Sequence, residues 1–494
     1  MVVPPEAPAS LPDVAWIGEA VADGLPDALA FLGVPVVTRD DRLAAQEALE
    51  IPRVLLTRAT HIRIAEALGA SRMVLGTYAV DGDKLDLSLR VLDIERGALS
   101  SPFIASGPLD QLVESLDGLA WDIALSGPSA PARTREELRQ RRTPVSFETL
   151  KAYAEGLAAA DAPTRRKLLT RALSLYPSYD AARLALGRLQ LETREFTAAH
   201  DTLARMPTDS PLSRLARFLR GTALLELGRY REAAGVCAAL TAEDPTPAVL
   251  NNQAIALVRS GSKPPGASSL LRRAVDGDPA SADIAFNLGW VLLNEGDPDA
   301  AAFWLRGVVR DEPRDTHAQL VLAWALRKAG RLEEADREWK AIAALAPSYE
   351  ALFNIDLSRR FERILASERA LQLDRETRND AQVAENLVGE AERLAAAGDT
   401  ESALRELTRA AYLDSHDPRV HRLLARSHRA RGDTEQAIGE LRMSLWSRED
   451  PEVRMELADL LRTAGRIAEA RAEAERVLKA DPANATAREF LDRP

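Results

Sequence analysis

Residues 279–313 read PASADIAFNLGWVLLNEGDPDAAAFWLRGVVRDEP, and this stretch indicates the fold class. Apolar side chains recur at helical spacing over residues 285–292, and a second apolar stripe follows over residues 301–308. Gly296 separates the two stripes, and Pro313 follows the second one. Because glycine and proline end helices, the stretch predicts two antiparallel helices joined by a tight turn.

The same unit recurs along the chain. Prolines stand 34 residues apart, at Pro177, Pro211, Pro245, Pro279, Pro313 and Pro347. A fixed period of this length is typical of stacked helical hairpins, in which each unit buries its apolar face only against its neighbours. Within one unit, the small residues Gly289 and Ala301 are expected to let the two helices approach closely. Turns between paired helices are predicted at Gly228, Gly261, Gly296 and Gly330.

The small, large and proline positions of these units resemble the tetratricopeptide repeat (TPR), and the pattern resumes with Gly398, Gly432 and Gly465. The resemblance implies an all-α solenoid, a right-handed superhelix, over residues 147–347 and 385–482, with a capping helix at 483–494. Residues 348–384 keep a helical period but lack a central glycine. They are either a degenerate repeat forming one long helix or a break that separates two arrays.

Residues 1–126 have a different pattern, in which helical stripes alternate with short apolar runs. Helices are predicted at 15–31, 40–49, 58–68 and 109–125. Strands are predicted at 2–3, 34–37, 72–80, 85–94 and about 98–105, with a hairpin turn at 81–83. The fold class is therefore a small α+β (α/β) amino-terminal domain followed by an all-α solenoid.

This order of elements resembles the TolB amino-terminal-like domain, whose relatives include the FlgO and CsgG types. The resemblance depends on Trp16-Ile17-Gly18-Glu19, on Leu68-Gly69-Ala70 and on Val74-Leu75-Gly76. It implies no enzyme activity, and many relatives belong to the bacterial cell envelope. Residues 127–146, rich in arginine and proline, are interpreted as a solvated linker or short connecting helix, with a patch for anionic lipid or an acidic partner as the alternative.

Composition excludes several classes of function. The chain has 494 residues, a net charge of −11 and a single cysteine, Cys237. The acidic balance disfavours nucleic acid as the partner, and one cysteine allows neither an internal disulfide nor a multi-cysteine metal site. No apolar run reaches the length of a transmembrane segment. The start lacks the pattern of a signal peptide, so a cytoplasmic location is expected; a truncated start would allow a periplasmic or envelope-associated one.

No constellation of catalytic residues is evident, so the chain is expected not to be an enzyme and to need no cofactor or metal. Cys237 occupies an apolar helical position and is interpreted as a structural thiol. His421 and His428 are separated by two helical turns, too far for shared metal ligation, and are interpreted as packing residues.

A repeat array exposes a concave groove along the first helix of each unit, here called the A helix, and such grooves bind extended segments. Asn252 and Asn287 occupy one repeat position, and an asparagine there can hydrogen-bond a peptide backbone. Trp290 and Trp324 follow about one turn along, with partly exposed indole rings expected as binding anchors. The candidate partner-binding residues are Asn252, Asn287, Trp290, Trp324, Arg188, His317 and Arg327. The alternative is that these side chains only pack between repeats.

The predicted function is a non-enzymatic scaffold or adaptor in a bacterial assembly, with a protein or peptide partner. The alternative is an envelope assembly or secretion component that acts through its TolB-like domain, with the array as a spacer. The sequence leaves the oligomeric state and the partner open.

Overall fold

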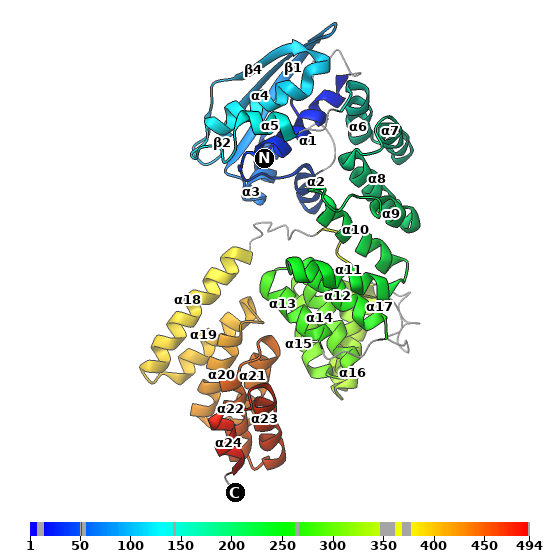
Figure 1. The fold of residues 1–494 in the computed structure, drawn as a ribbon. Coiled ribbons are helices and arrows are strands. Elements are labelled where there is room, and N and C mark those ends of the chain that lie inside the picture. The colour runs from blue at the N-terminus through cyan, green and yellow to red at the C-terminus, as the bar shows by residue number, and fades with distance from the viewer. Residues whose placement is uncertain are drawn as a thin grey trace. The chain divides into compact units, whose positions relative to one another are not determined.

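The computed structural model describes residues 1–6, 14–49, 51, 56–141, 145–261, 266–345, 361–367 and 377–492. Figure 1 follows the chain from the amino-terminal sheet through the helical repeats. The chain divides into two compact units, one formed largely by Met1–Asn252 and the other by Gln253–Leu365 and Glu376–Pro494.

The first unit begins with a small antiparallel sheet. Strands β1 (Arg72–Asp81) and β2 (Lys84–Asp93) form a hairpin, in which Gly82 takes the left-handed conformation that a two-residue turn requires. Strands β3 (Ala98–Leu99) and β4 (Phe103–Pro108) both pair with β2. The predicted strand at 2–3 is present as a short parallel pairing with β1, through a bridge between Val2 and Val74. The predicted hairpin is therefore confirmed, and the predicted third strand consists of two pieces.

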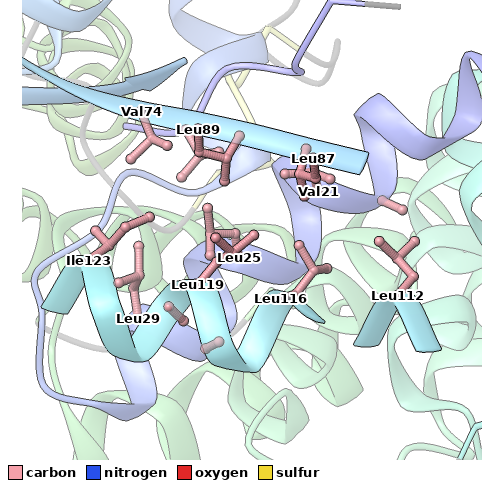
Figure 2. Close-up of a cluster of buried hydrophobic side chains, with 14 of the residues drawn as sticks. Val21, Leu25, Leu29, Val74, Leu87, Leu89, Leu112, Leu116, Leu119 and Ile123 are labelled. Atoms are coloured by element: carbon pink, nitrogen blue, oxygen red, sulfur yellow. The ribbon is translucent and has the colours of Figure 1, made fainter. Parts of the chain in front are cut away.

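Two helices cover one face of this sheet and supply most of the core. The helices α1 (Trp16–Phe31) and α4 (Leu112–Leu125) direct apolar side chains toward β1 and β2, as Figure 2 shows for the labelled leucines and valines. Two shorter helices, α2 (Arg39–Ala48) and α3 (Arg58–Ala67), lie between α1 and β1 in the chain. The four predicted helices are present within a few residues. The strand predicted at 34–37 was wrong, because these residues form no strand and instead connect α1 to α2.

The segment that joins the sheet domain to the repeats is mostly exposed where the structure describes it, and it forms the predicted short connecting helix. It contains a short helix, α5 (Arg135–Arg141), and Leu138 on that helix is fully buried in the sheet domain's core. The first repeat helix, α6 (Phe147–Ala158), packs on α1. Phe147 lies edge-on to Trp16, and the Tyr153 hydroxyl donates to Asp23 at 2.8 Å. The apolar contacts of α5 and α6 therefore join the sheet domain and the first repeat into one packed body.

The repeat helices follow in antiparallel pairs. They are α7 (Ala162–Leu175), α8 (Asp180–Glu192), α9 (Phe196–Leu203), α10 (Ser213–Glu226), α11 (Tyr230–Glu243), α12 (Pro247–Arg259), α13 (Ala267–Gly277), α14 (Ala282–Glu295), α15 (Pro298–Asp311), α16 (Thr316–Lys328) and α17 (Leu332–Leu345). The predicted turn glycines, Gly228, Gly261, Gly296 and Gly330, all have positive φ. Across the described part of 147–347 there is no strand, so the predicted paired helices are confirmed.

Local capping explains why these helices begin and end where they do. The Ser281 side chain accepts a hydrogen bond from the backbone N–H of Ile284 at the start of α14. Gly296 ends α14 with φ of 90°, a conformation that a side chain would strain. Asp297 then caps α15 by accepting from Ala300. One short sequence thus stops a helix, turns the chain and starts the next helix.

The close contact between the paired helices α14 and α15 can be tested by substitution. A Cβ placed on Gly289 would lie 2.6 Å from Cγ of Leu305, so α14 and α15 touch where the sequence predicted. We expect Gly289→Leu to overpack this contact and lower the free energy of unfolding by about 1–3 kcal/mol, measured by urea denaturation. Gly389→Leu is the matched control, because nothing lies within 4 Å of a Cβ there. Equal losses in the two variants would contradict the close-contact interpretation.

The second unit also contains the carboxy-terminal repeats. Their helices are α18 (Thr377–Ala396), α19 (Thr400–Leu413), α20 (Pro418–Arg431), α21 (Thr434–Ser447), α22 (Pro451–Thr463), α23 (Ile467–Ala480) and the terminal α24 (Ala485–Asp492). Ala487 and Phe490 of α24 pack onto the last repeat, as expected for a capping helix. Residues 361–367 form no helix, so the prediction of one long helix across 348–384 is wrong for these residues. Residues 348–360 and 368–376 lie outside the described residues.

The two sets of repeats in the second unit meet at an aromatic cluster. The ring of His416, in the connection between α19 and α20, stacks on the indole of Trp304 with centroids 4.2 Å apart. Phe303 lies edge-on to the same imidazole, at 5.0 Å. A Cβ on Gly307 would lie 2.3 Å from the His416 ring, so only glycine leaves room for this contact. The cluster therefore fixes α15 against the start of α20.

Candidate peptide-binding site

Residues 361–363 contact the A helices of the second unit as an extended peptide would. This segment has neither helix nor strand, and Phe361, Glu362 and Arg363 each contact one or more A helices. We call the contacting side chains the A-helix site. They are Arg259 on α12; Asp283, Phe286 and Asn287 on α14; and Asp315, His317 and Trp324 at α16.

The Asn287 side chain holds the segment by its backbone. Its amide nitrogen donates to the carbonyl oxygen of Arg363, and its amide oxygen accepts from the Arg363 backbone N–H, both at 2.8 Å. An amide side chain has one acceptor and one donor group, so it can pair with both backbone groups of a residue. This contact requires no particular side chain on the bound residue.

An aromatic side chain occupies one end of the A-helix site. The ring of Phe361 lies edge-on to His317 at 5.6 Å and to Trp324 at 5.5 Å. Both partners lie on α16 and face the same ring. Edge-to-face contacts of this kind add about 0.5–1.5 kcal/mol to the burial of apolar area.

The charged side chains of the segment meet opposite charges. Arg363 donates to Asp283 at 2.9 Å and also pairs with Asp315, and its guanidinium lies 4.0 Å from the centroid of the Phe286 ring. An open pocket adjoins this arginine, with Glu312, Pro313, Arg314, Asp315 and His317 as its other lining residues. The site thus offers two carboxylates and an aromatic face to a basic side chain.

The acidic residue of the segment is the most deeply buried. The Glu362 side chain is 0% exposed, and its two carboxylate oxygens accept from the guanidinium of Arg259, with Nε to Oε1 at 2.9 Å. The same guanidinium lies 5.1 Å from the ring centroid of Trp290. Because a buried carboxylate is costly unless paired, the ion pair with Arg259 offsets the cost of burying Glu362.

The structure corrects the expected exposure of the predicted residues. Trp290 and Trp324 are 1% and 7% exposed, so the expectation of partly exposed indole rings was wrong. The side chain of Phe361 covers Trp324, and the Arg259 guanidinium lies against Trp290. Asn252 and Asn287 are also completely buried. The contact of Phe361 with Trp324 had no signal in the repeat pattern.

The seven predicted residues do not form one site. Asn287, His317 and Trp324 contact residues 361–363, and Trp290 lies beneath Arg259. Asn252 lies on α12, where its side-chain oxygen accepts from Asn251 at 3.1 Å. Arg327 is exposed on α16. Arg188, in the first unit, pairs with Asp40 of the sheet domain, so it is not part of the A-helix site.

Sequence reasoning missed the charged half of the site. Arg259, Asp283 and Asp315 were not selected, because isolated charges on helix ends usually face solvent. The available signal was in the stretch 348–384, which lacks the central glycine of a repeat and contains the apolar Phe361 close to the charged Arg363. A segment without a repeat pattern that carries both kinds of side chain is a candidate for docking on the repeats.

The single cysteine, Cys237, is buried. Burial raises the pKa of the Cys237 thiol to about 12, so this cysteine is far from a reactive thiolate at neutral pH. Among the residues that the structure describes, no group of three or more histidine, cysteine, aspartate or glutamate side chains could hold a metal ion. Within the same ranges, no helix combines the length and apolar character of a membrane span.

Comparisons with known proteins identify the repeats. Family models described as tetratricopeptide repeat match residues 157–220, 251–315, 316–341, 388–454 and 455–491, together more than half of the chain. No curated protein matches the chain.

Solved structures similar to this chain include YrrB, "a TPR protein with an unusual peptide-binding site", with 18% identity, 37% of this chain and 93% of that chain covered, and a TM-score of 0.32. The MamA protein has 17% identity, with 36% and 96% covered and a TM-score of 0.30. A protein from Parabacteroides merdae has 13% identity, with 57% and 97% covered and a TM-score of 0.36. On the evidence of the matched family models and the paired helices, this chain belongs to the tetratricopeptide repeat family.

Proposed function

We propose that this chain is a protein-interaction scaffold, in a bacterial assembly, whose A-helix site binds an extended segment of a partner protein. The observation that carries the proposal is the pair of hydrogen bonds between Asn287 and the Arg363 backbone. Every polypeptide offers the same N–H and C=O groups, so the amide can serve a partner segment in the same way.

The surrounding side chains support a peptide rather than a small molecule or nucleic acid. Phe361 and Arg363 contact residues on α14 and α16, and Glu362 contacts α12, so recognition is spread over three successive A helices. Such a distribution suits a ligand that presents one side chain after another along an extended backbone. The site also contains the carboxylates of Asp283 and Asp315, which disfavour phosphate groups.

A test uses a variant in which the resident segment binds the site more weakly. In the released variant, defined as Phe361→Ala with Glu362→Ala and Arg363→Ala, the contacts to Trp324, Arg259, Asp283 and Asp315 are absent. Selection of displayed random heptapeptides on this variant should enrich peptides that bind to it. Adding Asn287→Ala should weaken the selected peptides by about 1–3 kcal/mol, or roughly 5- to 100-fold in Kd, because two backbone hydrogen bonds are lost.

Asn294→Ala is the matched control for this experiment. Asn294 lies on the same helix, is exposed, and donates to the Trp290 carbonyl of its own helix at 2.7 Å. This variant should bind the selected peptides as the released variant does. The proposed function fails if no peptide is enriched, or if Asn287→Ala and Asn294→Ala have the same effect.

A second candidate function rests on the sheet domain. In the described part of the chain β4 pairs on one side only, with β2, and its Ile104 side chain is 68% exposed. An unpaired edge with an exposed apolar residue can accept a strand from a partner. The resemblance to TolB-like domains then implies an envelope assembly with the repeats as a spacer. If this function is correct, Ile104→Lys should prevent the chain from co-purifying with its partner in cell-envelope fractions. Normal co-purification of the variant with its partner would exclude this function.

A further inference from the structure

We infer that residues 361–363 act as an internal ligand, which occupies the A-helix site in competition with a partner and shows what that partner carries. The partner is an extended segment with an aromatic, an acidic and a basic residue in succession, as in Phe361-Glu362-Arg363. The inference rests on the proposed function and adds to it the chemical identity of the ligand and its regulation by the chain itself.

The kind of contact separates this segment from an ordinary repeat element. Repeat helices pack on one another through apolar stripes, as Gly289 and Leu305 do. The segment instead pairs its backbone with a side-chain amide and places each side chain against a complementary group. Contacts of this kind are those of a bound peptide, here supplied by the same chain.

Each position of the segment has its own selectivity. The position of Phe361 meets two aromatic rings, which reward a flat apolar side chain. The position of Glu362 meets the buried Arg259, where a neutral or basic side chain would leave a cation without its pair. The position of Arg363 meets two carboxylates and the face of Phe286, an arrangement that suits the planar guanidinium.

Competition follows from covalent attachment. Because the segment belongs to the same molecule as the site, its effective concentration there exceeds that of a dilute free peptide, so a free peptide with the same contacts is at a disadvantage. Weakening the resident segment should therefore raise the apparent affinity for a free peptide. A partner that binds more contacts than the segment does, for example in the pocket beside Arg363 and His317, would displace it.

The test measures binding of a fluorescent peptide, FERILAS, the sequence of residues 361–367, to the full chain by fluorescence anisotropy. The released variant should bind this peptide at least tenfold more tightly than the unmodified chain does. Circular dichroism should show that both proteins are folded. Phe361→Ala alone is the milder second variant and should give an intermediate affinity.

A charge exchange tests the chemistry of the site. In the released background, Arg259→Glu should lose binding of FERILAS and gain binding of FKRILAS, because the buried pair is rebuilt with its charges reversed. A peptide with glutamate at the third position, FEEILAS, should bind at least tenfold more weakly than FERILAS, because it faces Asp283 and Asp315. A merely apolar or nonspecific surface would not show this exchange.

The outcomes separate the inference from the proposed function. If the released variant binds FERILAS no better than the unmodified chain, competition by the segment is overturned. If it binds selected heptapeptides but not FERILAS, the inferred partner pattern is overturned while the proposed function stands. If it binds no peptide at all, both fail. A dimer of the unmodified chain that dissociates in the released variant, seen by light scattering, would overturn the internal ligand in favour of exchange between copies.

Discussion

Arg259→Met is expected to detach residues 361–365 from the A-helix site. The Glu362 carboxylate is 0% exposed and receives both of its guanidinium hydrogen bonds from Arg259. Removing one partner of a buried ion pair costs about 3–5 kcal/mol of stability, because the remaining buried charge has neither water nor an opposite charge beside it. The segment can avoid this cost by leaving the site, so we expect local release rather than unfolding of the repeats.

Hydrogen exchange measures this release directly. The Arg363 backbone N–H donates to Asn287, and its exchange should accelerate by a factor of ten or more in Arg259→Met, while the amides in the middle of α14 stay protected. Arg273→Met is the control, since Arg273 is an exposed arginine on the neighbouring helix α13. Unchanged protection of residues 361–365 in Arg259→Met would show that the buried pair does not hold the segment.

His416 should make the contact between the two sets of repeats sensitive to acid. Burial lowers the pKa of its imidazole to about 3, with Arg310 and His421 acting in the same direction and a hydrogen bond to the Phe303 backbone opposing them. The folded protein therefore keeps this ring neutral, whereas the unfolded chain protonates it near pH 6.5. Stability from the neutral ring is present above pH 6.5 and is lost as the pH falls toward 3.

The neighbouring His421 acts in the opposite direction. Burial lowers its pKa, but hydrogen bonds to Glu440 and to the Ser415 carbonyl more than offset this, so its pKa is raised overall. Its contribution to stability is therefore present below pH 6.5 and is lost as the pH rises through the raised pKa. A pH titration of the unmodified protein alone would mix the two contributions, so the His416 contribution has to be isolated with a variant.

His416→Gln removes the buried imidazole and leaves His421 in place. At 1.36 kcal/mol per unit of pKa difference, acidification from pH 7 to pH 4 should destabilise the unmodified protein by about 3 kcal/mol more than the variant. Urea denaturation at several pH values, followed by circular dichroism, measures this difference. The comparison at pH 8, where neither imidazole is protonated in the unfolded chain, gives the packing cost of the substitution. Parallel stability curves for the two proteins between pH 8 and pH 4 would refute the prediction.

Much of the fold could be predicted because the signals for it are local. The prolines of the 34-residue series and the turn glycines act within one or two helical turns. The ends of α14 are likewise set by neighbouring residues, Ser281 at its start and Gly296 at its end. Gly289 was predictable as a close-contact position for the same reason, because its partner Leu305 lies in the next helix of the same repeat.

The contact between the sheet domain and the first repeat was less predictable. Residues 127–146 look like a linker by composition, since arginine and proline are frequent there. One apolar residue, Leu138, and the ring of Phe147 bring this region into contact with the sheet domain. Composition averages over such single residues, whereas burial of one leucine and one aromatic ring can decide whether two elements pack.

The A-helix site shows where sequence reasoning ends. The sequence by itself determined the helical repeats, the separate sheet domain and the presence of asparagine and tryptophan on the A helices. Only the tertiary structure decided that residues 361–363 lie against those helices, with Asn287 paired to a backbone 76 residues away. The physical reason is that helix period, caps and turns are short-range properties, whereas the docking of an irregular segment depends on charge and shape complementarity between residues distant in the chain.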